Sequence, residues 1–171
     1  LMPQVLDKLC ILFTKDIDPN QGHTKLQFEA ARLISILTKN LSLSRTLIQQ
    51  HHIQAIIDTM YMRLRGKFKV DLAELLTFSL KNITEHGASL LTGNSTLIQA
   101  LAEIMYNLLR LQLIAKSEHV CANVIHAIGM LATIPSFFQV YPGSPSAIIP
   151  IVSENLLYSK EHMEQCANVF A

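Results

Sequence analysis

The sequence predicts an all-α fold built from stacked helical units. In residues 24–40, Ala30, Leu33, Ile34 and Leu37 follow helical spacing, which is typical of a helix that packs on an inner layer. The pattern returns in residues 70–86 and 118–134, with a period in the mid-forties, and breaks in the pattern fall at corresponding places. Because this period is typical of helical solenoids, each unit is expected to bury its apolar face against its neighbours.

The first elements form a partial repeat over residues 1–40. Pro3 occupies a favourable first-turn position for a helix through residues 4–13. Asp18, Pro19, Asn20 and Gly22 supply turn chemistry for the loop that follows. Thr24 can then cap a helix over residues 25–39.

Residues 41–86 are predicted to form one complete repeat of three helices. A short helix covers residues 43–50, and a second helix covers residues 53–62. A basic connector with Gly66 as its breaker follows, and the long third helix then covers residues 70–85.

The same order of helices recurs over residues 87–134, and again, cut short, over residues 135–171. The first of these repeats is predicted to have a short helix, a second helix and a third helix at residues 88–91, 97–111 and 118–133. The corresponding helices of the last repeat are predicted at residues 136–140, 147–158 and 160 onward. Residues 166–169 repeat the letters CANV of residues 121–124, which supports this register.

The composition limits the class of protein. Apolar residues make up 50% of the 171 residues, charged residues make up 16%, and the net charge is +1, as in a protein of packed helices. No window holds the ~18 uninterrupted apolar residues of a membrane span. No signal peptide is visible, and the charge gives no indication of a nucleic-acid partner. The three cysteines lie in helical patterns, which favours buried thiols and a cytoplasmic or nuclear location.

The third helices resemble those of the armadillo-repeat family. The segments LQFEAARLISILTKN at residues 26–40 and LAELLTFSLKNITEH at residues 72–86 are similar to that family's small-x-x-aliphatic-x-N-L-A ending. Gln50, His51 and His52 stand where the family usually has Gly-Ala, and HEAT repeats share the length range. The resemblance implies a right-handed superhelical solenoid of armadillo-like three-helix repeats over the whole chain.

The resemblance also implies a concave groove, lined by the third helices, that binds an extended or helical segment of another protein. The import-receptor subgroup places an Asn four residues after a Trp, and only Phe78 and Asn82 retain comparable chemistry here. An Asn amide can both donate to and accept from a peptide backbone. The residues expected to line the groove are Arg32, Ser35, Phe78, Ser79, Asn82, Asn123 and His126.

One basic cluster stands apart from the expected groove. It consists of Arg63, Arg65, Lys67 and Lys69, and Phe68 is its single aromatic residue. Such a cluster can bind an acidic partner, a lipid headgroup or a phosphate backbone. Four charges in a connector with a single aromatic residue more often form a solvated loop, so the sequence favours that interpretation over a binding site.

The sequence contains no recognisable motif for catalysis or metal binding. Seven histidines are present, but His51 and His52 are adjacent, and His119 and Cys121 are two residues apart, so the side chains of each pair diverge on a helix. Paired-cysteine and HExxH patterns are absent, as are Gly-rich phosphate loops and a Gly-x-Ser-x-Gly sequence. We therefore expect no metal, no cofactor, no small-molecule substrate and no reaction.

The leading functional hypothesis is a non-catalytic adaptor that binds a segment of another protein. As an alternative, Phe137, Phe138 and Val140 are expected to be exposed and could pack on another domain or another copy, which would make the chain a structural or dimerisation segment. A third hypothesis is a regulatory domain of a larger enzyme, of which these residues would be a piece.

Overall fold

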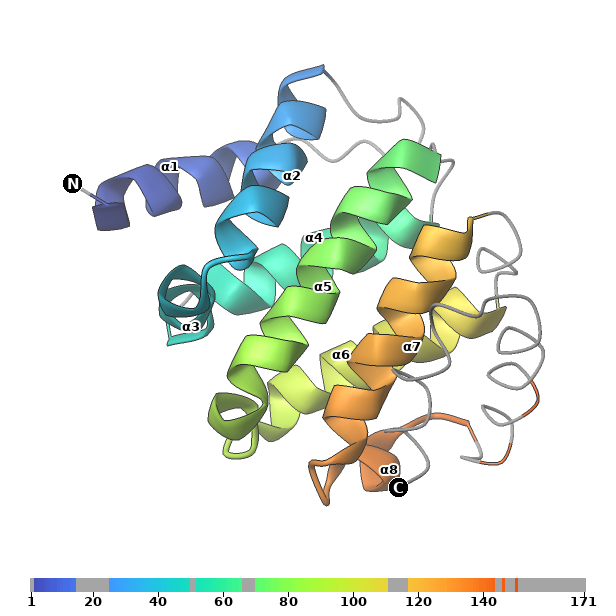
Figure 1. Cartoon of the computed structure of the whole chain (residues 1–171). Helices are drawn as coiled ribbons and strands as arrows, with labels where there is room; N and C mark the ends of the chain where they lie inside the picture. Colours follow the sequence, from blue (N-terminus) through green and yellow to red (C-terminus); the bar gives the residue numbers. More distant parts are fainter. Residues whose placement is uncertain are drawn as a thin grey trace.

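The computed structural model describes residues 2–14, 25–49, 52–65, 70–110, 117–143, 146 and 150. All regular secondary structure in these residues is helical, as the sequence predicts (Figure 1). The helices are α1 (Met2–Thr14), α2 (Lys25–Thr38), α3 (Leu41–Gln49), α4 (His52–Arg65), α5 (Val70–Leu91), α6 (Ser95–Arg110), α7 (Glu118–Ala132) and α8 (Phe137–Val140).

The longer helices pack in two layers. In the view of Figure 1, α2, α5 and α7 lie side by side in front, and α5 contacts both of its neighbours. Behind them, α1 contacts α4, and α4 contacts α6. The short α3 contacts α2, α4 and α5, while α8 contacts α6 and α7. The chain therefore alternates between the layers and brings residues about one repeat apart next to each other.

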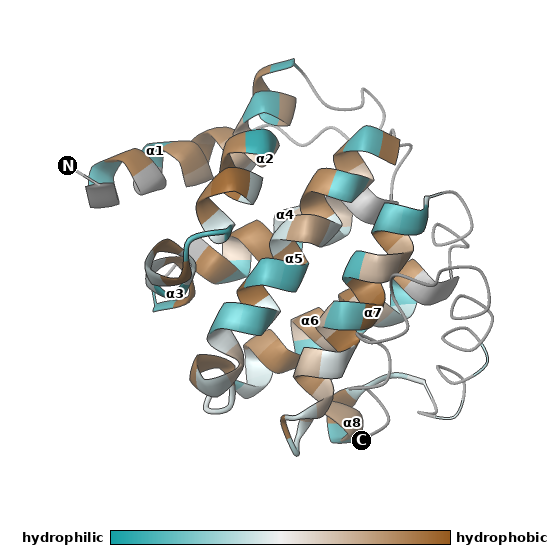
Figure 2. Cartoon of the chain, in the orientation of Figure 1, coloured by the Kyte–Doolittle hydropathy of each residue, from teal (hydrophilic) through white to brown (hydrophobic). Residues whose placement is uncertain are grey.

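Apolar side chains from both layers form a common core. Ile34 of α2, Leu80 of α5 and Val124 of α7 are at most 1% exposed, as are Ile57 of α4 and Leu101 of α6. Hydrophobic and hydrophilic turns alternate along the front helices (Figure 2), as expected of amphipathic helices. Full burial of each such side chain stabilises the fold by about 1.5–3 kcal/mol. The apolar face of each helix therefore turns toward the core.

Side-chain caps define the start of three helices. The backbone N–H of Leu43 donates to Asn40 Oδ1 over 3.1 Å, and that of Leu97 donates to Asn94 Oδ1 over 3.0 Å. At α7, the N–H of Val120 donates to Ser117 Oγ over 3.3 Å. Each cap satisfies an N–H group that has no partner inside its helix.

Residues 88–91 do not form the separate short helix that the sequence predicts. They are the last turn of α5, which runs unbroken to Leu91. Gly87 does not interrupt the helix, since a single Gly costs a helix interior only about 1 kcal/mol. Its missing side chain leaves space that Ile48 of α3 occupies, because a Cβ at Gly87 would collide with the Ile48 side chain. The packing of α3 therefore accounts for a glycine inside this helix.

Three other expectations are wrong. Helix α4 continues through Arg65, so Arg63 and Arg65 belong to a helix and not to a connector. Leu33 is 50% exposed, because at 3.6 residues per turn it points away from the buried side of α2, which carries Ala31 and Ile34. Phe137 is fully buried, because its ring packs 5.5 Å from that of Tyr141.

Some predictions lie outside the described residues. They are the cap at Thr24, the loop over residues 16–23, the breaker at Gly66, and the helices predicted at 147–158 and from 160 onward, with the repeated letters at 166–169. The predicted burial of cysteines is confirmed at Cys10 and Cys121.

Candidate functional site

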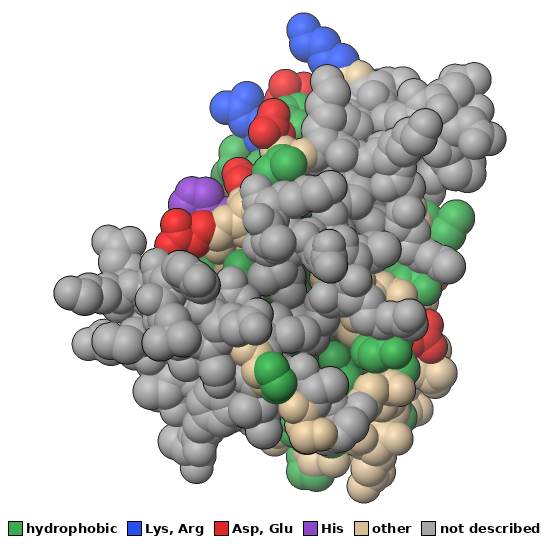
Figure 3. Space-filling model, turned by 90° about the vertical axis from the view of Figure 1, so that its right-hand side faces the viewer, with side chains coloured by type: hydrophobic (Ala, Val, Ile, Leu, Met, Phe, Trp, Pro, Cys, Tyr) green, Lys and Arg blue, Asp and Glu red, His purple; other side chains and the backbone are tan. Residues whose placement is uncertain are grey.

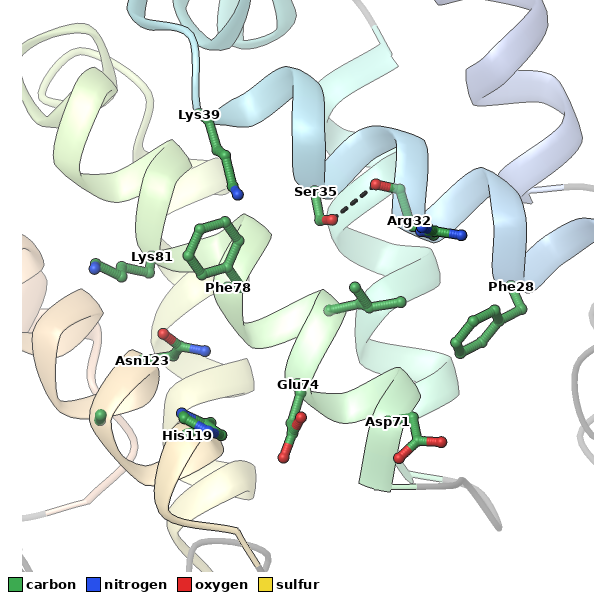
Figure 4. Close-up of a pocket in the computed structure, with 12 residues that line it drawn as sticks. Phe28, Arg32, Ser35, Lys39, Asp71, Glu74, Phe78, Lys81, His119 and Asn123 are labelled. Atoms are coloured by element: carbon green, nitrogen blue, oxygen red, sulfur yellow. Dashed lines mark hydrogen bonds between the residues drawn. The ribbon is translucent and has the colours of Figure 1, made fainter.

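A groove of about 710 Å³ lies on the front layer, and all three helices of that layer line it (Figure 4). The segment of α2 and the residue that follows it contribute Phe28, Arg32, Ser35 and Lys39, α5 contributes Asp71, Glu74, Leu75, Phe78 and Lys81, and α7 contributes His119, Ala122 and Asn123. Most neighbours in each set are three or four residues apart, which places them on one face of their helix.

Phe78 lies between two lysines, away from the start of α5. The Nζ atom of Lys39 is 5.2 Å from the centroid of the Phe78 ring, and the Nζ atom of Lys81 is 5.9 Å from it. Figure 4 shows the ring between the two side chains. Cation–π contacts at such exposed sites contribute about 0.5–1 kcal/mol each. The lysines therefore form a cationic end of the groove around an aromatic surface.

Two carboxylates lie at the other end of the groove. Asp71 is in the first turn of α5, where the helix dipole stabilises a negative charge. Glu74 Oε1 accepts a 2.6 Å hydrogen bond from Ser117 Oγ, which ties α5 to the start of α7. Figure 4 shows Asp71 and Glu74 near the start of α5, away from Phe78. Along α5, the groove thus carries opposite charges at its two ends, and Arg32 of α2 adds a further positive charge to the lining.

Three other polar side chains of the groove, those of Arg32, Ser35 and Asn123, already have partners within the protein. Ser35 Oγ donates to the backbone oxygen of Arg32 over 2.7 Å, and Arg32 pairs with Glu29 at 3.6 Å. This pair is more than 45% exposed on both sides, so it contributes little to stability. Asn123 Nδ2 donates to Thr77 Oγ1 over 3.3 Å, which directs the amide of Asn123 along the boundary of α5 and α7.

Four of the seven residues predicted to line the groove come together there: Arg32, Ser35, Phe78 and Asn123. The other three lie elsewhere. Ser79 is fully buried, and its hydroxyl donates to the backbone oxygen of Leu75 over 2.9 Å. Asn82 is 5% exposed, and its Nδ2 donates to Thr38 Oγ1 over 3.3 Å. Asn82 therefore connects α5 to α2, and Ser79 is buried within the front layer, so neither side chain faces the groove.

His126 lies on α7, one turn beyond Asn123, beside the end of α5. Its Nε2 atom is 3.3 Å from Oε2 of Glu85, although the contact lacks hydrogen-bond geometry. Burial lowers the pKa of His126 below 6.5, and the charge of Lys81 lowers it further, while Glu85 opposes both. The imidazole is therefore mainly neutral at pH 7, and its contact with Glu85 becomes an ion pair only on protonation.

The basic cluster cannot be placed against this groove. The side chains of Arg63 and Arg65, and the whole of Lys67 and Lys69, lie outside what the structure describes.

Sequence reasoning missed the charged residues that give the groove its polarity. Lys39, Asp71, Glu74 and Lys81 all line it. Helical spacing could have found them, since positions 32, 35 and 39 share one face of a helix, as do positions 71, 74, 78 and 81. Lys39, for example, lies four residues after Ser35, on the helix face that Arg32 and Ser35 already define.

No three His, Cys, Asp or Glu side chains come together as a metal site in the described part of the chain. Within the same residues, no helix is both long and apolar enough to cross a membrane.

Neither protein-family models, nor curated proteins, nor solved structures match this chain. The resemblance to armadillo repeats therefore stays a prediction, and the groove has to be interpreted from its own geometry.

Proposed function

We propose that this chain is a right-handed armadillo-like solenoid that acts as a non-catalytic interaction scaffold. Its partner is a segment of another protein, which binds in the groove over α5, between α2 and α7. The observation that carries this proposal is the groove itself. Its lining comes from residues 28–39, 71–81 and 119–123, which are about one repeat apart in the sequence. Helices from successive repeats line one groove together, which gives a segment of another protein contacts with more than one repeat.

The chemistry of the lining supports a peptide ligand. Phe78 offers an apolar surface, Asn123 can pair with a peptide backbone, and both signs of charge are present. Affinity for a protein segment concentrates in a few aromatic or charged anchors surrounded by weaker contacts. Phe78 is the anchor in this proposal.

Display of random peptides on immobilised protein tests the proposal. Peptides selected on the wild-type chain are then measured against Phe78→Ala and against Phe138→Ala. Phe138 is a matched control, because it is 40% exposed on α8 and does not line the groove. Phe78→Ala is expected to weaken binding at least about tenfold, the loss of an aromatic anchor, without lowering the melting temperature by more than a few degrees.

Three results would contradict this proposal. Wild-type affinity in Phe78→Ala would remove the groove as the binding site, and an equal loss in Phe138→Ala would show that the peptides bind elsewhere. Failure to select any peptide on the wild-type chain would also count against it.

Exposed apolar side chains on α1 and α2 favour self-association as a second candidate function. Val5, Ile11, Leu26 and Leu33 are each at least 50% exposed, and they belong to two helices that contact each other, so some of them can join an interface between two copies. Light scattering over a range of concentrations tests this candidate. A mass that rises with concentration and returns to that of one chain in Leu26→Glu/Leu33→Glu supports it, whereas a constant monomer mass removes it.

A further inference from the structure

The groove separates its charges along the central helix. Lys39 and Lys81 flank Phe78, while Asp71 and Glu74 lie nearer the start of α5 (Figure 4). Among the described residues, neither lysine lies within ion-pair distance of a carboxylate. Side-on, in Figure 3, most of the visible charged side chains gather along the upper left edge, where the front layer lies. Charges of this kind are available to a partner of opposite charge.

The spacing of the charges sets the spacing in the ligand. Asp71 precedes Phe78 by seven residues on α5, and Glu74 precedes Lys81 by the same interval. At 1.5 Å per residue, each interval corresponds to about 10.5 Å along the helix axis. An extended polyproline II backbone rises about 3.1 Å per residue with three residues per turn. Side chains three residues apart in such a segment therefore lie on one side, about 9.3 Å apart.

The polar lining of the groove favours an extended ligand over a helical one. A helix satisfies its own backbone groups, whereas an extended segment leaves them unpaired. The Asn123 amide donates to Thr77 through its nitrogen, so its oxygen can accept from the backbone N–H of an extended ligand.

We propose that the groove binds an extended segment carrying a carboxylate side chain and, three residues away in either chain direction, a Lys or Arg side chain. The carboxylate lies between Lys39 and Lys81 beside Phe78, and the cation meets Asp71 and Glu74. This inference rests on the proposed function and specifies its partner. A wholly acidic or wholly basic segment would meet a like charge at one end, and this repulsion provides the specificity.

The test compares the peptides selected from a random display library on three proteins. One is wild type, one is Lys39→Glu/Lys81→Glu, and the matched control is Lys8→Glu/Lys25→Glu. The control changes the net charge equally at two exposed positions outside the groove. Wild type and control are expected to enrich acid–base pairs spaced three residues apart by about tenfold over the unselected library. Lys39→Glu/Lys81→Glu is expected to enrich two basic residues at that spacing instead.

Folding of each protein is checked by circular dichroism. If the double reversal unfolds, Lys39→Gln/Lys81→Gln replaces it and is expected to lose the preference for the acidic residue while keeping the basic one. Peptides that need Phe78 but show no charge pattern, or the same pattern in all three proteins, overturn the inference and leave the proposed function standing. A wild-type chain that selects no peptide overturns both.

Discussion

The contact between Gly87 and Ile48 provides a sharp test of how α3 packs on α5. A Cβ at Gly87 would collide with Cδ1 of Ile48 and lie 3.3 Å from Cγ1. Ala gains about 1 kcal/mol over Gly in a helix interior, but forcing an extra carbon into a packed site costs about 1–3 kcal/mol. Gly87→Ala is therefore expected to lower the free energy of unfolding by about 1 kcal/mol.

Removal of the colliding carbon should reverse this sign. Ile48 is 8% exposed, so Ile48→Val alone is expected to cost about 0.5–1.5 kcal/mol. In the Ile48→Val protein, the collision no longer offsets the higher helix propensity of Ala. Gly87→Ala is then expected to stabilise the protein by up to about 1 kcal/mol. The two substitutions should then couple by about 2 kcal/mol, which is typical of side chains in direct contact.

Urea unfolding of the four proteins, followed by circular dichroism, measures this coupling. Gly93→Ala is the matched control, because a Cβ there has no atom within 4 Å, and its effect is expected to stay within about 0.5 kcal/mol. Additive effects of Gly87→Ala and Ile48→Val would refute the packing of α3 on α5. They would also reopen the possibility of a break in α5 at this glycine.

Three further predictions concern other parts of the molecule. Asn82→Ala is expected to lower the free energy of unfolding by about 1–2 kcal/mol, because Asn82 donates to Thr38 between helices, and to leave the affinity for selected peptides unchanged; denaturation and binding curves check both. His126 has a pKa lowered from 6.5 by burial, so the unfolded chain binds its proton more readily and stability falls as the pH drops below 6.5. Melting temperatures between pH 7.5 and 5.5 should fall less steeply in His126→Gln, and an equal slope contradicts this cause. Leu76→Ala, at a fully buried position, is expected to cost about 2–5 kcal/mol in the same denaturation assay.

Helical periodicity predicted the fold class because it depends on spacing within a single segment. The stripe through Ala30 and Ile34 is buried as expected, and α2 and α7 lie close to their predicted bounds. The end of α5 was wrong because it depends on contact with α3. A glycine at position 87 looks like a break in the sequence, and only the position of Ile48 shows that it is a site of close packing.

The candidate site could be predicted only in part for a similar reason. Phe78 and Asn82 share a helical face by spacing, yet Asn82 turns to Thr38, which is more than 40 residues away in the chain. No local pattern specifies how α2 sits against α5, so the sequence did not separate side chains that join helices from those that face outward. Lys39 and Glu74 were missed because only the aromatic–amide pair, Phe78 and Asn82, matches a known peptide-binding pattern, whereas charged residues on a helix are usually solvated.

Chemical-shift mapping of a selected peptide on the isotope-labelled chain tests the binding face most directly. If the groove is the binding site, the largest shifts occur at Ser35, Phe78 and Asn123, with little change at Val5 of α1 or Phe138 of α8. The largest shifts at Val5 or Phe138, with none at Phe78, would contradict this account.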